Sequence, residues 1–191
     1  MKCLPYIDEA TATKSAKRVI ATGGPGAGKT TVLDTLKMRG YPIVEESARA
    51  IMRERIRRDL PPRPGPREFA IKVMQSDITN YRSIEPFSGC VFFDRGLPDA
   101  LCMLDQVTQL GQKKLTALNG SYPYHQQVFV FPPWEEIYRQ DAERDQTFFD
   151  AIRIFEILSQ WYRRCGYNLV EVPMVSVADR CDFILRELGL D

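Results

Sequence analysis

The sequence predicts an α/β fold in which a five-stranded parallel sheet lies between two layers of helices. Five short apolar runs are nearly continuous rather than alternating, as expected for strands buried on both faces of a parallel sheet. Longer segments with helical spacing separate these runs, so strands and helices alternate along the chain. A glycine-rich loop joins the first strand to the first helix. The expected strands are residues 19–22, 42–45, 90–94, 127–131 and 168–172.

Length and composition indicate one globular domain. A chain of 191 residues, with 44% hydrophobic and 27% charged residues, is long enough for a single substantial core. Its net charge of +1 argues against bulk binding of nucleic acid, and no apolar run is long enough for a membrane span. We therefore expect neither a nucleic-acid nor a membrane partner. Residues 1–16 are expected to form a separate N-terminal arm, and residues 17–191 the domain.

The cysteines and the N-terminal segment favour the cytoplasm. The five cysteines lack short paired spacing and the chain has one histidine, so neither a disulfide framework nor a zinc site is predicted. The first residues are polar and lack the apolar centre of a signal peptide.

Glycine and proline residues set the limits of the first helices. Gly40 is a plausible C-cap after the first helix. The four prolines of residues 60–66 would break the backbone hydrogen-bond ladder of a helix. They separate a basic helix, about residues 48–59, from a longer one at about residues 67–84.

Two later helices have start signals of their own. Pro98 suits the first turn of a helix that runs towards Leu110. Ser176 begins a sequence that resembles a capping box without its usual glutamate, and it opens a last helix that continues to Leu188.

The loop of residues 23–31 reads Gly-Gly-Pro-Gly-Ala-Gly-Lys-Thr-Thr. A strand before it and a helix after it are the context in which G-x-x-x-x-G-K-[ST] binds phosphate. Its glycines let backbone N–H groups turn towards one anion, and the start of the helix adds unpaired N–H groups. Lys29 is expected to reach the terminal phosphates and Thr30 to place its hydroxyl on Mg²⁺.

The alternative to a phosphate site is a glycine-rich turn that binds no ligand. We favour the phosphate site, and therefore predict binding of a nucleoside triphosphate. The residues expected to bind it are Gly24, Pro25, Gly26, Ala27, Gly28, Lys29, Thr30 and Thr31.

An aspartate ends the third predicted strand. Asp94 would lie at the sheet edge where open α/β sheets bind ligands, and beside a phosphate loop it is expected to hold Mg²⁺ directly or through water. Alternatively, Asp94 caps the loop that follows. The next residue is Arg95, where a motor ATPase of the AAA type would be expected to carry glutamate. An arginine favours positioning a phosphoryl group over activating a water molecule.

The second predicted strand also leads into carboxylates. Side chains alternate along a strand, so only one of Glu45 and Glu46 can face the cleft. We favour Glu46 as the ligand or general base for a substrate hydroxyl. Alternatively, both glutamates simply stabilise the N-terminus of the next helix.

Arg49, Arg53 and Arg57 recur every four residues and therefore form one basic stripe on a helix. The default interpretation of such a stripe is a solvated face. The functional interpretation is a cradle for an anionic acceptor, with Arg49 nearest the sheet edge. Arg63 and Arg67, which flank the proline-rich loop, would then join it.

Residues 132–145 are highly charged and follow the fourth predicted strand. A mobile lid that carries arginines onto transferring phosphates would have this composition and place. Arg139 and Arg144 would then be internally supplied arginine fingers. Alternatively, the segment is an exposed charged helix.

Three stretches resemble the small P-loop AAA-type ATPase/kinase domains. They are the loop of residues 23–31, Val-Glu-Glu-Ser-Ala-Arg at 44–49, and Phe-Phe-Asp-Arg-Gly at 92–96 with Phe-Pro-Pro-Trp-Glu downstream. These domains are similar to the ribosylnicotinamide kinase domain of the bifunctional NAD-biosynthesis regulator, and more distantly to deoxynucleoside and thymidylate kinases. The resemblance spans residues 18–188 and implies a three-layer P-loop kinase fold with strand order 2-3-1-4-5.

The resemblance also implies roles for individual residues. It implies that Asp94 and Arg95 lie in the phosphate site, that Glu46 faces the acceptor, and that the segment with Arg139 and Arg144 is a lid.

Together these expectations describe an ATP- and Mg²⁺-dependent phosphotransferase that acts on a small molecule, such as a nucleoside or nucleotide-like compound. The acceptor would lie near Glu46, Arg49 and Arg95. ATP is favoured over GTP because the chain lacks the guanine-reading Asn-Lys-x-Asp sequence. The alternative function is an NTP-hydrolysing switch that regulates a protein partner. A ring-forming AAA+ motor is disfavoured because the chain lacks the Asp-Glu pair and room for a helical lid domain.

Overall fold

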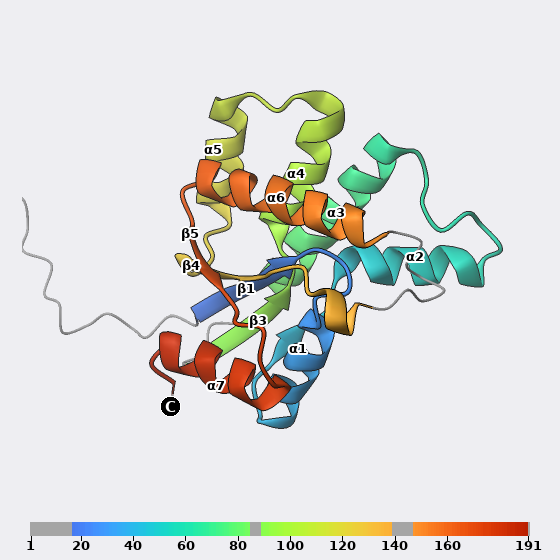
Figure 1. The fold of residues 1–191 in the computed structure, drawn as a ribbon. Coiled ribbons are helices and arrows are strands. Elements are labelled where there is room, and N and C mark those ends of the chain that lie inside the picture. The colour runs from blue at the N-terminus through green and yellow to red at the C-terminus, as the bar shows by residue number, and fades with distance from the viewer. Residues whose placement is uncertain (1–16, 85–88, 139–146, 191) are drawn as a thin grey trace, which may run out of the picture.

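The computed structural model describes residues 17–84, 89–138 and 147–190. Five parallel strands form one sheet in the order β2-β3-β1-β4-β5, with helices on both faces (Figure 1). The α/β class and the strand order 2-3-1-4-5 are therefore confirmed. The predicted arm of residues 1–16 lies outside the described residues. The strands are β1 (Lys17–Gly23), β2 (Ile43–Val44), β3 (Cys90–Asp94), β4 (Gln127–Phe131) and β5 (Asn168–Glu171).

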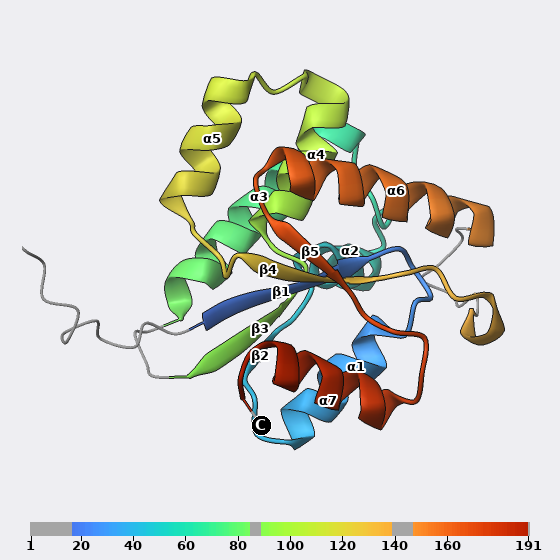
Figure 2. The same cartoon turned by 60° about the vertical axis from the view of Figure 1, so that its left-hand side comes forward.

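The helices form two layers around this sheet. Figure 2 shows α1 and α7 on one face and α3, α4 and α6 on the other. Among the described residues, none of the helices has both the length and the apolar character that a membrane span requires. The helices are α1 (Lys29–Met38), α2 (Ser47–Arg57), α3 (Pro66–Ser83), α4 (Leu97–Thr108), α5 (Gln112–Ser121), α6 (Phe148–Arg164) and α7 (Val177–Glu187), with a short 3₁₀ helix, η2, at Glu135–Ile137.

Side chains of the central strands alternate between two cores. Val19, Phe92 and Phe129 belong to the cluster that includes α1 and α7. Ile20 and Phe93 belong to the cluster under α3, α4 and α6. Because both faces of the central strands are covered, the buried part of each strand is largely apolar, as in Val19–Ala21 of β1 and Val91–Phe93 of β3.

The edge strands are shorter than the sequence predicts. Residues 42–45 contribute only Ile43–Val44, and residues 168–172 end as a strand at Glu171. Only Ile43 and Val44 of the first run pair with β3, and the pairing of β5 with β4 ends at Glu171.

A helix that the sequence did not reveal follows α4. Gln109, with a left-handed φ of 51°, ends α4, and Gly111 begins α5. Leu115 is the only fully buried residue of α5, so the helix has little apolar periodicity to detect. By contrast, the expected cap of the last helix is confirmed, since Ser176 Oγ accepts from the Asp179 N–H at 3.2 Å.

Candidate functional site

The loop between β1 and α1 has the backbone shape of an anion site. Gly26 and Gly28 adopt φ values of 74° and 75°, in the left-handed region that favours glycine. A Cβ on Gly24 would lie 2.6 Å from the carbonyl oxygen of Ala151 in α6, so the close approach of loop and helix requires glycine there. Gly28 is the N-cap of α1 and offers no side chain to its first N–H groups. An anion can satisfy those groups instead.

A cavity of about 750 Å³ opens over this loop. All of the predicted nucleotide-binding residues, 24–31, line it, together with residues of α2, α3, α4 and α6. Glu46, Arg49 and Arg95 are also in its wall. The loop and the predicted acceptor residues therefore surround one continuous space, with a volume typical of small-molecule sites.

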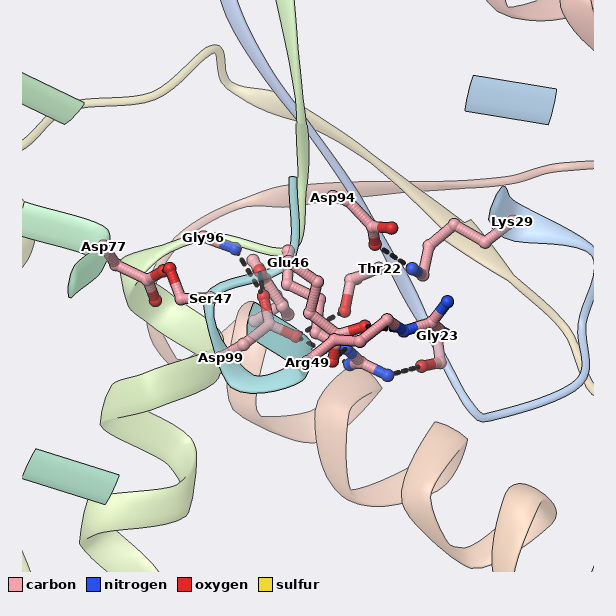
Figure 3. A network of polar contacts seen from close by, with 12 residues as sticks. Thr22, Gly23, Lys29, Glu46, Ser47, Arg49, Asp77, Asp94, Gly96 and Asp99 are labelled. Carbon is pink, nitrogen blue, oxygen red and sulfur yellow. Dashed lines mark hydrogen bonds and ion pairs between the residues drawn. The ribbon is translucent and has the colours of Figure 1, made fainter. Parts of the chain in front are cut away.

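Lys29 and Asp94 form a buried ion pair beneath the loop. Lys29 Nζ contacts Asp94 Oδ1, and the two side chains are 7% and 10% exposed (Figure 3). Lys29 is the first residue of α1, and Asp94 is the last residue of β3. Pairing compensates two charges that would each be costly to bury alone. The predicted roles of Lys29 towards phosphate and of Asp94 towards Mg²⁺ stay predictions.

Arg95 connects three separate parts of the chain around the cavity. Its Nε donates to Glu46 Oε1 at 3.1 Å and its Nη1 to Asp99 Oδ1 at 3.1 Å. Its Nη2 donates to the carbonyl oxygen of Gly23 at 2.8 Å. Burial alone would lower the pKa of Arg95, but the charges of Glu46 and Asp99 raise it above its ordinary value. The guanidinium therefore stays charged and holds Glu46 beside the loop.

Glu46 lies at the N-cap of α2 and lines the cavity, whereas Glu45 is exposed. Arg49 Nε lies 3.9 Å from Glu46 Oε2. Burial alone would raise the pKa of Glu46, but the cations around it, Arg95 first, lower it below the ordinary value. The cavity therefore contains an ionised carboxylate that can accept a hydrogen bond from a ligand hydroxyl.

Asp99 is a site residue to which the sequence assigned no functional role. Its carboxylate, on α4, accepts from Thr22 Oγ1 at 2.6 Å and from Tyr162 Oη at 2.5 Å. It also accepts from the Gly96 N–H and from Arg95. The first two donors are 77 and 63 residues away in sequence, so no local pattern could have shown this network.

Asp77 is a second carboxylate that the sequence did not identify. It lies on α3, is 8% exposed, and lines the cavity. Ser47 Oγ donates to Asp77 Oδ1 at 2.5 Å, and Asn80 Nδ2 donates to Ser47 Oγ at 3.1 Å. Burial raises the pKa of Asp77 to about 7, against the opposing effect of the Ser47 hydrogen bond.

The predicted basic stripe divides between cavity and solvent. Arg49 lines the cavity, whereas Arg53 and Arg57 are exposed. Arg63 also lines the cavity, and Arg67 is exposed outside its wall. Arg49 and Arg63 are therefore the members of the proposed cradle that are near enough to meet a ligand.

The predicted lid is described only at its start. Arg139 and Arg144 lie outside the described residues, so their role stays a prediction. The residues before them form the 3₁₀ helix Glu135–Ile137, from which Ile137 reaches the cavity.

The oxygen atoms around the loop suit a Mg²⁺ ion that also binds phosphate oxygens. In the described ranges, no three His, Cys, Asp or Glu side chains gather into a metal site. Mg²⁺ commonly uses one or two protein oxygens and completes its shell with water and phosphate oxygens. The Thr30 hydroxyl in the cavity wall and the Asp94 carboxylate beneath it could supply oxygens of this kind.

A family model described as an AAA domain matches residues 18–180. The chain belongs to this AAA domain family. No curated protein sequence matches the chain.

Several solved structures share its fold. Deoxyadenosine kinase from M. mycoides aligns with a TM-score of 0.61 at 16% identity, covering 90% of this chain and 98% of that chain. Thymidylate kinase from Candida albicans aligns with a TM-score of 0.61 at 10% identity, covering 92% of each chain. The YorR protein from Bacillus subtilis aligns with a TM-score of 0.58 at 16% identity, covering 91% of this chain and 96% of that chain. The chain therefore has the fold of P-loop nucleoside and nucleotide kinases.

Proposed function

We propose that this protein transfers the γ-phosphoryl group of ATP, with Mg²⁺, to a hydroxyl of a nucleoside or nucleotide-like small molecule. The observation that carries the proposal is the single cavity that joins the phosphate loop to Glu46 and Arg95. Kinases of nucleosides and nucleotides among the proteins of the same fold support the substrate class. The likeness to a ribosylnicotinamide kinase domain keeps that nucleoside among the candidates.

The loop end of the cavity would bind the triphosphate. Backbone N–H groups of residues 24–31 would surround the phosphates, and Lys29 would turn from Asp94 to the terminal ones. Thr30 and Asp94 would hold Mg²⁺, which offsets the negative charge of the phosphates when bound. Because Lys29 and Asp94 contact each other, the two must separate for both roles. Binding of nucleotide and metal is therefore expected to be coupled.

The other end would hold the acceptor. Glu46 would accept a hydrogen bond from the acceptor hydroxyl, whose oxygen attacks the γ-phosphorus. A bond forms between that oxygen and phosphorus, the bond to the bridging oxygen breaks, and ADP leaves with its electron pair. The hydroxyl proton passes to Glu46. Arg95 keeps the carboxylate in place, and Arg49 would contribute positive charge near the transferred group.

The lid residues would complete the site. We propose from the sequence that Arg139 and Arg144 close over the phosphates and exclude water, since an open site would hydrolyse ATP.

The test is formation of a phosphorylated product. The purified chain is incubated with ATP, Mg²⁺ and a panel of nucleosides and nucleoside monophosphates, and products are identified by mass spectrometry. We expect at least one panel member to gain a phosphoryl group, and the Lys29→Ala variant to form none. ADP and free phosphate alone, across the whole panel, would instead favour the NTP-hydrolysing switch.

A further inference from the structure

The acceptor end of the cavity contains a polar group that the proposed transfer does not use. Asp77 lines the cavity from α3 and is 8% exposed. In the part of the chain that the structure describes, the Asp77 carboxylate accepts one hydrogen bond, from Ser47 Oγ to Oδ1. Its second oxygen, Oδ2, is therefore available to a ligand in the cavity.

The hydrogen bonds around Asp77 determine its orientation. Asn80 donates its amide N–H to Ser47 Oγ, so the single hydroxyl hydrogen of Ser47 is directed to Asp77 Oδ1. Ser47 follows Glu46 directly in the chain and is 4% exposed. The start of α2 therefore positions both the residue proposed to meet the acceptor hydroxyl and the partner of Asp77. Figure 3 shows Asp77 next to Ser47.

Asp77 also lacks the charge compensation of its neighbours. Lys29 pairs with Asp94, and Arg95 pairs with both Glu46 and Asp99. Among the described residues, no cation forms an ion pair with Asp77, and its recorded partner is a neutral hydroxyl. A buried carboxylate of this kind favours a ligand that donates hydrogen bonds.

Apolar side chains lie near Asp77 in the cavity wall. Val73, one turn earlier on α3, and Met52 and Met103 line the same cavity. These side chains pack in one apolar cluster between α2, α3 and α4. Apolar side chains in a small-molecule site contact the body of the ligand, and a few placed polar groups fix its orientation.

We propose that Asp77 is a specificity-determining residue of the acceptor site, and that it accepts a hydrogen bond from an amino group on the base of a nucleoside acceptor. This inference rests on the proposed function, because it assigns the acceptor of the same cavity. Above about pH 7, where Asp77 is ionised, a base with a carbonyl at the corresponding position would place oxygen against oxygen and leave Asp77 without a donor.

Two matched pairs of nucleosides test the inference. Cytidine and uridine differ by an amino and an oxo group, as do adenosine and inosine. At about pH 8, where Asp77 is ionised, kcat/KM is measured for each compound with saturating ATP and Mg²⁺, and binding is measured separately by calorimetry without ATP. We expect the amino member of at least one pair to be preferred by about 100-fold, because a site built for a donor rejects an analogue that lacks it.

Asp77→Asn is the decisive variant, because its carboxamide can still accept from Ser47 but offers an N–H donor to the cavity. We expect it to abolish or reverse the amino preference while the KM for ATP stays unchanged. Glu68→Gln is the matched control: it neutralises an exposed carboxylate of the same helix, outside the cavity wall, and should keep the preference.

The outcomes separate this inference from the proposed function. Phosphorylation with an oxo preference, or with a ratio that Asp77→Asn leaves unchanged, overturns the inference and supports the proposed function. Failure of all four nucleosides both to bind and to react also overturns the inference, while other hydroxyl compounds still test the transfer. Binding of an amino nucleoside that depends on Asp77 but never leads to its phosphorylation supports the inference and contradicts the proposed function.

Discussion

The two ends of the cavity are built in different ways. The loop end consists of consecutive residues, 23–31, whose backbone and helix start would provide the proposed anion site. The acceptor end is assembled from separate elements, and its central contact, Arg95 with Glu46, joins residues 49 positions apart. A short sequence can specify the first kind of site, whereas the second exists only after the sheet and its helices have formed.

The ends also differ in charge. At the loop end, Lys29 and Asp94 balance each other one to one. At the acceptor end, Arg95 pairs with Glu46 and Asp99 and Arg49 lies 3.9 Å from Glu46, whereas among the described residues Asp77 forms an ion pair with neither arginine. At the loop end, phosphate and metal could therefore take the place of the contact between Lys29 and Asp94. The acceptor end is suited to a ligand that donates hydrogen bonds.

The largest effect is expected at the loop end. Lys29→Ala should lower ATP turnover by about 1,000-fold or more, because the variant loses the cation expected at the transferring phosphates. Turnover and thermal unfolding are measured on the same preparation, since Asp94 loses its partner. A folded variant with full turnover would contradict the phosphate-site assignment. The double variant Lys29→Ala/Asp94→Asn controls for the unpaired charge.

Asp94→Asn is expected to have the next largest effect. It should reduce Mg²⁺-dependent activity by about 100-fold and raise the Mg²⁺ concentration needed for half-maximal rate, because an amide is a weaker ligand than a carboxylate. The measurement is the initial rate across a Mg²⁺ titration. An unchanged metal requirement would leave Asp94 as a partner of Lys29 alone.

Glu46→Gln tests the acceptor end by itself. We expect kcat for phosphoryl transfer to fall by about 100-fold while ATP affinity stays within about threefold, because the change removes a proton acceptor but leaves the loop intact. Initial rates and equilibrium nucleotide binding separate the two effects. Glu45→Gln, at the exposed neighbour, is the control and should behave like the wild-type protein.

The smallest effect is on stability and depends on pH. The pKa of Asp77 is raised to about 7, so the folded protein keeps a proton that the unfolded chain has already lost. The stability associated with Asp77 is therefore fully present below about pH 4 and is lost as pH rises through about 7. Asp77→Asn should gain on the order of 2 kcal/mol over wild type at pH 8 and little at pH 4. Urea unfolding at the two pH values measures this difference, and an equal gain at both would contradict the assignment.

Much of the fold could be predicted because its signals are local. The buried part of each central strand is largely apolar, and the loop of residues 23–31 carries its own motif. The start of α7 was also evident, because Ser176 and Asp179 cap it within one turn. The helix α5 was missed because burial of Leu115 alone leaves no apolar stripe.

The acceptor end was predicted only in part, for a physical reason. Glu46 and Arg95 were visible because each lies at the end of a strand, where the fold class places ligands. Asp77 and Asp99 lie on helices, and their roles depend on partners from other elements. In sequence alone, each is an ordinary aspartate on or at the start of a helix.

The central claim is that one cavity binds ATP at the loop and a phosphoryl acceptor beside Glu46. The most direct test follows ADP and phosphorylated nucleoside together by mass spectrometry during one reaction with ATP and Mg²⁺. The account predicts that the two form in equal amounts, and that Glu46→Gln slows both while ATP still binds. ADP released with free phosphate, at a rate independent of every acceptor and unchanged by Glu46→Gln, would contradict it.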